Sequence, residues 1–129
     1  MQTTTPVSKT ARWTGWVLSL LPVLMLLMSA IMKLMQPPAV VEGFVKFGYP
    51  ASLILGLGLV ELACTVIYLI PRTAMLGAIL LTGYLGGATA TLVRVGDPTF
   101  FAPAVLGILV WGGLYLRYPP LRTLIPLRR

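Results

Sequence analysis

Residues 51–70 read ASLILGLGLVELACTVIYLI, and Glu61 is the only charged side chain among them. A helix needs about 20 predominantly apolar residues to cross the hydrocarbon core of a bilayer, which is about 30 Å thick. Pro71 follows directly and marks the end of the run. The stretch therefore predicts a membrane-spanning helix that carries one carboxyl group near its middle.

Three further apolar runs surround this stretch and cover residues 13–34, 74–93 and 102–116. Together the four runs predict an all-α fold, a polytopic membrane four-helix bundle that forms one domain over residues 13–118. We expect residues 1–12 to be a flexible N-terminus and residues 119–129 to be a basic tail.

The composition excludes a soluble or a disordered protein. Of the 129 residues, 57% are hydrophobic and 10% are charged, and the mean hydropathy is +0.91. About a quarter of the residues of a soluble domain are charged, and disorder requires low hydrophobicity. The chain is therefore expected to be a membrane protein.

The same composition narrows the chemistry. Cys64 is the only cysteine and histidine is absent, so the chain lacks the commonest general base and the commonest metal ligand. We predict no metal site, no catalytic residues and no catalytic activity of the chain on its own. The basic residues are dispersed at the ends of the apolar runs, which argues against a nucleic-acid partner.

The segment 36–50 between the first two runs is too polar to span the membrane. Pro37 and Pro38 can begin a helix, and Val41, Phe44 and Val45 would share one face of it. This pattern predicts a short interfacial helix between the first and second spans. An irregular loop is the alternative, because the glycine at position 43 weakens a helix.

The positive-inside rule orients the bundle. With four spans, both termini and the connection after residue 70 lie on one side, which holds seven basic residues: Lys9, Arg12, Arg72, Arg117, Arg122, Arg128 and Arg129. The other side holds three: Lys33, Lys46 and Arg94. We therefore predict that the N- and C-termini are cytoplasmic.

Glu61 lies ten residues into its span, about 15 Å deep at 1.5 Å per residue. Gly58, Thr65 and Tyr68 share its helix face, so this stripe should face the bundle interior. Tyr84 lies at a similar depth in the third span, and a hydrogen bond between Glu61 and Tyr84 is geometrically reasonable.

Two basic residues are expected near the outer ends of their spans, above Glu61. Lys33 and Arg94, with Trp111 at similar depth, would make a pocket that opens outward and accepts a quinone, a polar lipid or a small amphiphile. Lys33 could instead extend its ammonium group to the headgroups, and the pocket could equally be a filled core.

Several segments resemble the DoxX-like family of small bacterial four-helix membrane proteins over nearly the whole chain from Trp13. They are MKL at 32–34, GYP at 48–50, ELAC at 61–64, YLIPRTA at 68–74, LGAILLTGYLGGA at 76–88 and RVGD at 94–97. Lys33, Glu61, Tyr84 and Arg94 match the family pattern. Many relatives carry a histidine two residues before the arginine that matches Arg94, whereas this chain has Leu92.

The resemblance implies a multi-pass protein of the bacterial inner membrane. Relatives in the broader DoxX group are linked to quinone-coupled sulfur oxidation and oxidative-stress complexes, and distant eukaryotic relatives to receptor assembly. We therefore expect a membrane subunit of an oxidoreductase complex that interacts with a quinone or lipid through Glu61, Tyr84, Lys33 and Arg94. A partner protein would carry the redox centre, and a mechanism that uses the missing histidine is not available here.

Two other functions fit the sequence. Small residues at positions 74, 78, 82, 86 and 90 and the pair Gly83 and Gly87 are typical of close helix packing. They fit a non-catalytic assembly factor or scaffold for other membrane proteins, or a homo-oligomer. A small proton-coupled transporter is the third alternative, which would need two access states from four helices.

Overall fold

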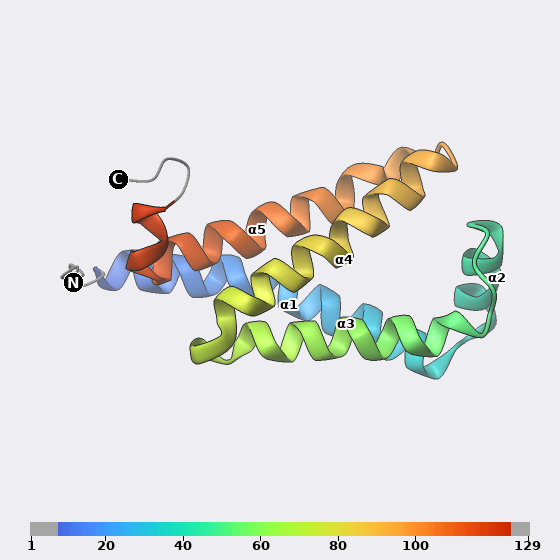
Figure 1. Ribbon diagram of the computed structural model, residues 1–129, viewed down its shortest axis with the longest axis horizontal. Coiled ribbons are helices and arrows are strands. Elements are labelled where there is room, and N and C mark those ends of the chain that lie inside the picture. The colour runs from blue at the N-terminus through green and yellow to red at the C-terminus, as the bar shows by residue number, and fades with distance from the viewer. Residues whose placement is uncertain (1–7, 125–129) are drawn as a thin grey trace.

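The structure is a computed structural model that describes residues 8–124 (Figure 1). Five α-helices follow one another along the chain: α1 (Lys9–Met35), α2 (Pro38–Lys46), α3 (Leu53–Leu69), α4 (Ala74–Arg94) and α5 (Phe101–Arg117). Three short 3-10 helices lie between and after them: η1 (Pro71–Thr73), η2 (Pro98–Phe100) and η3 (Pro119–Thr123). No strand occurs in residues 8–124, so the predicted all-α fold is confirmed.

Three helical segments are long and apolar enough to cross a membrane: Lys9–Met35, Pro71–Arg94 and Pro98–Arg117. The fourth expected span, α3, is an apolar helix of 17 residues, shorter than the usual span of about 20. The prediction of four spans is therefore supported directly for three, and a crossing by α3 stays a prediction.

The four long helices run side by side (Figure 1). The helix α1 packs against α3 and α5, and α4 packs against the same two helices. The start of α1, the end of α5 and η1 lie at one end of the molecule, and α2 lies at the other end with the connection between α4 and α5. This ring of contacts surrounds one core, to which Leu26, Tyr68, Leu81 and Leu114 belong.

Glycines allow two of these helix pairs to approach closely. A Cβ atom on Gly113 of α5 would collide with the Ser19 side chain and come within 2.8 Å of the Gly15 carbonyl oxygen, both in α1. A Cβ atom on Gly77 of α4 would collide with the backbone of Tyr68 in α3. Small residues let membrane helices pack backbone to backbone, so their presence in the sequence indicates close contacts of this kind.

The helix ends follow local rules. The Ser8 hydroxyl accepts a hydrogen bond from the Ala11 amide at 3.1 Å, so α1 begins at Lys9, four residues before the start that the apolar run predicts. Gln36 ends α1 in the left-handed conformation with φ of 51°. Pro37 and Pro38 then begin α2, so the segment is helical and the alternative of an irregular loop is wrong.

Candidate functional site

The polar stripe on α3 faces the bundle interior, as the sequence predicts. Glu61 is 2% exposed, and Thr65 and Tyr68 are fully buried. Gly58 is also buried, because α1 crosses α3 there: a Cβ atom on Gly58 would lie 2.9 Å from the Cβ of Lys33. The absence of a side chain at Gly58 therefore lets α1 approach α3 closely, near Glu61.

Glu61 is held by two residues of α1. The Lys33 Nζ donates to the Glu61 Oε1 at 2.9 Å, and the Ser29 Oγ donates to the same oxygen at 3.1 Å. Lys33 also donates to Ser29 at 2.6 Å, one helical turn away. The ammonium group of Lys33 thus lies between the Glu61 carboxylate and the ring of Tyr84, and the hydrogen bond expected between Glu61 and Tyr84 stays a prediction.

Lys33 turns into the protein instead of extending to the headgroups. Its side chain is 11% exposed. Its Nζ lies 5.7 Å from the ring centroid of Phe44 in α2 and 5.8 Å from that of Tyr84 in α4. Both distances allow a cation–π interaction. Lys33 is thus the point where α1, α2, α3 and α4 meet.

Two cavities adjoin Lys33. We call the first the α2 cavity; it has a volume of about 420 Å³ and lies between α2 and helices α1, α3 and α4. Its lining includes Lys33, Phe44, Phe47, Tyr49, Tyr84 and Thr91. The second, of about 260 Å³, lies between α1 and α2 and shares Lys33, Phe44 and Phe47 with the first. Of the residues predicted for the pocket, Lys33 and Tyr84 line the α2 cavity, whereas Glu61 lies behind Lys33 and lines neither cavity.

Arg94 does not line either cavity. Its Nη2 donates to the carbonyl oxygen of Phe47 at 2.5 Å, so the exposed guanidinium group ties the end of α4 to the end of α2. Tyr49 and Thr91 share a hydrogen bond of 2.6 Å close by. Arg94 is therefore a residue that holds the wall of the α2 cavity in place.

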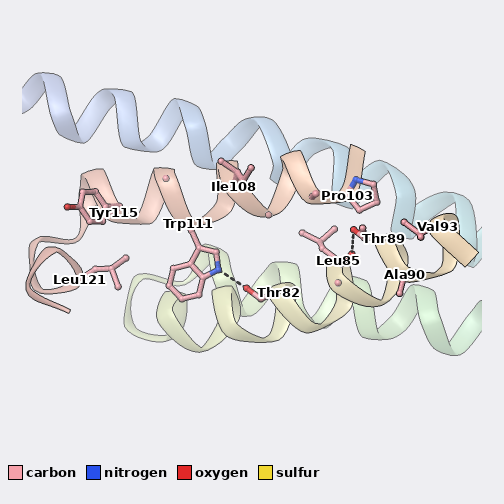
Figure 2. A pocket seen from close by; sticks show the side chains of 14 residues that line it. Thr82, Leu85, Thr89, Ala90, Val93, Pro103, Ile108, Trp111, Tyr115 and Leu121 are labelled. Carbon is pink, nitrogen blue, oxygen red and sulfur yellow. Dashed lines mark hydrogen bonds between the residues drawn. The ribbon is translucent and has the colours of Figure 1, made fainter. Parts of the chain in front are cut away.

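Trp111 lies elsewhere, and its expected place in this pocket is wrong. Its indole nitrogen donates to the Thr82 hydroxyl at 2.6 Å (Figure 2). Both residues line a separate apolar groove of about 820 Å³ between α4 and α5. The Trp111 ring lies in this groove, which neither Lys33 nor Tyr84 lines.

Sequence reasoning missed two polar groups. Ser29 precedes Lys33 by four residues, and this spacing on one helix face is the signal that could have found it. A second cluster joins Ser19, Tyr68 and Arg117 near the other end of the bundle. No spacing rule points to this cluster, because its three members come from three different helices.

Three helical segments are long and apolar enough to cross a membrane, which defines the chain as a helical membrane protein, and a buried ion pair lies beside a cavity. The profile of the DoxX-like family matches residues 17–113, and the chain belongs to that family. No curated protein and no solved structure matches the chain.

Proposed function

We propose that the chain is a membrane subunit that binds the headgroup of a quinone or of an uncharged polar lipid in the α2 cavity. It would act within an oxidoreductase complex in which a partner protein carries the redox centre. The observation that supports this most is that Lys33, which is buried and paired with Glu61, lines two adjoining cavities. Buried ionisable groups in membrane segments typically mark ligand sites or ion pathways.

The lining of the α2 cavity suits an uncharged ring with hydrogen-bond acceptors. Phe44 and Phe47 give apolar walls, and Lys33 and Tyr84 offer N–H and O–H donors. Glu61 balances the charge of Lys33, which disfavours an additional anion at this point. The volume of about 420 Å³ falls within the range of small-molecule sites.

A quinone would supply the electron-accepting chemistry when bound. The residues of this chain would bind the headgroup, orient its carbonyl oxygens towards Lys33 and Tyr84, and exclude water. The proposal includes a crossing of the membrane by α3, cytoplasmic termini and residence in the bacterial inner membrane. The α2 cavity would then open at the level of the outer headgroups.

Tyr84→Phe tests this proposal because it removes one hydroxyl donor from the lining of the α2 cavity and keeps the aromatic ring. We expect quinone and lipid extracted from the purified variant to fall about two- to tenfold, the effect of one lost hydrogen bond. Tyr118→Phe, a change at an exposed residue near the other end, is the matched control. Equal ligand content in wild type and both variants would contradict the proposal.

The groove between α4 and α5 favours a second function, a scaffold that binds a transmembrane helix of a partner. Its lining is almost entirely apolar and includes three glycines at positions 86, 107 and 112 (Figure 2). A Cβ atom at Gly86 meets nothing within 4 Å, so Gly86→Leu would fill the groove without disturbing the fold. Loss of co-purifying membrane proteins from this variant, with ligand content unchanged, would favour the scaffold.

A further inference from the structure

A second cluster of polar side chains lies at the end of the bundle that holds the start of α1 and the end of α5 (Figure 1). Arg117, the last residue of α5, places its guanidinium carbon 4.2 Å from the ring centroid of Trp16 and 5.2 Å from that of Tyr68. Its Nε donates to the Ser19 hydroxyl at 3.1 Å. The guanidinium group is thus fixed by one hydrogen bond and two aromatic rings.

Ser19 and Tyr68, the hydroxyl groups next to Arg117, do not offer it a second hydrogen-bond acceptor. Tyr68 donates its single hydroxyl proton to the Val110 carbonyl oxygen at 2.6 Å. Ser19 must therefore donate to Tyr68 at 2.8 Å, and it accepts from Arg117. The chain of donors runs one way, from Arg117 through Ser19 and Tyr68 to Val110. Within residues 8–124, the Nη2 of Arg117 is buried and has no hydrogen-bond partner.

No carboxylate within residues 8–124 forms an ion pair with Arg117. The sequence has three acidic residues, Glu42, Glu61 and Asp97. Glu61 is paired with Lys33, and the other two lie in α2 and in the connection between α4 and α5, at the opposite end of the molecule. A buried donor without an acceptor is costly, and the cost is larger for a charged group. The positive charge of Arg117 therefore has no acidic partner in the part of the chain that the structure describes.

We propose that Arg117 and Trp16 bind the phosphate group of an anionic phospholipid, in the leaflet that surrounds the end of the bundle with both termini. The planar guanidinium fork matches phosphate oxygens and is weakly hydrated. Trp16 and Arg117 are both partly exposed, and tryptophan favours the headgroup level. Val17 and Leu20, exposed on the same part of α1, offer apolar surface to the acyl chains.

Native mass spectrometry of the delipidated full-length protein tests the proposal. The protein is mixed with equal amounts of phosphatidylglycerol and phosphatidylcholine, and the bound fraction of each is measured. We expect wild type to retain phosphatidylglycerol preferentially and Arg117→Gln to lose this preference about tenfold. Arg72→Gln is the matched control, because Arg72 is an exposed cation at the same end, in η1. Equal preference in wild type and Arg117→Gln, or an equal loss in Arg72→Gln, would overturn the proposal.

Two further measurements keep the test decisive. Arg117→Lys keeps the charge but removes the planar fork and the Nε bond to Ser19, so we expect an intermediate preference even if Arg117→Gln does not fold. If Arg117→Lys kept the same preference for phosphatidylglycerol as wild type, the planar guanidinium group would not be needed, which would contradict the proposal. Inorganic phosphate at millimolar concentration should leave phosphatidylglycerol bound. Full displacement would assign the site to a free anion and overturn the lipid proposal.

Discussion

Lys33 and Glu61 show how single residues of this chain depend on each other. An isolated charge in the bundle would be costly, and the pair reduces this cost by direct contact at 2.9 Å with Ser29 as a third member. The depth of Glu61 in its span predicts its burial. The same reasoning leaves the position of Lys33 open, because a lysine near a helix end can also reach the headgroups.

Replacing one member of the Lys33–Glu61 pair should destabilise the fold more than its share of replacing both. We expect Glu61→Gln and Lys33→Met each to lower the free energy of unfolding by about 3 kcal/mol, since each strands a buried partner. The double variant Lys33→Met with Glu61→Gln should cost less than the sum of the two single changes. Denaturant titration in detergent micelles measures all three. Additive losses would show that the pair does not act as a unit.

At the level of elements, the helices of this chain are held by backbone contacts at glycines. Gly113 packs against Ser19 and Gly15, whereas the neighbouring Gly112 has nothing within 4 Å of a built Cβ atom. Two glycines of one helix thus have opposite surroundings, and the network of Arg117, Ser19 and Tyr68 depends on the first.

Gly113→Ala should separate α1 from α5 and lower the free energy of unfolding by about 1 to 3 kcal/mol, the usual cost of overpacking. Gly112→Ala in the same helix should be neutral or slightly stabilising, because alanine favours helix. Thermal unfolding in one detergent compares the two variants. Equal midpoints would mean that the contact between α1 and α5 is not tight at Gly113.

Sequence patterns predict these elements well because apolar runs and prolines act locally. The third run begins at Ala74, as expected, and Pro37 and Pro38 begin α2. The contacts between elements are harder to predict, since the pattern of one helix face does not determine how two helices are rotated relative to each other. Trp111 could have faced either side of α4, and it lies in the groove with Thr82. Likewise, the close approach of α1 and α3 at Gly58 allows Lys33 to reach Glu61, which the sequence left open.

For the whole molecule, the distribution of basic residues predicts cytoplasmic termini. Cysteines introduced singly at Thr10 and Glu42, both exposed, test this in a Cys64→Ala background. We expect a membrane-impermeant thiol reagent to label Glu42→Cys in intact cells and Thr10→Cys only after lysis. The reverse pattern would invert the topology, and labelling of both in intact cells would contradict an odd number of crossings between them.

For the molecule as a whole, we propose above all that the α2 cavity binds a headgroup beside Lys33 and its partner Glu61. The most direct measurement is photo-crosslinking of the purified protein with an azido-substituted quinone, followed by peptide mapping. We expect labels in α2 and α4, around Phe44 and Tyr84, that disappear with excess unmodified quinone. Labels confined to the groove between α4 and α5, or labels that excess quinone does not remove, would contradict it.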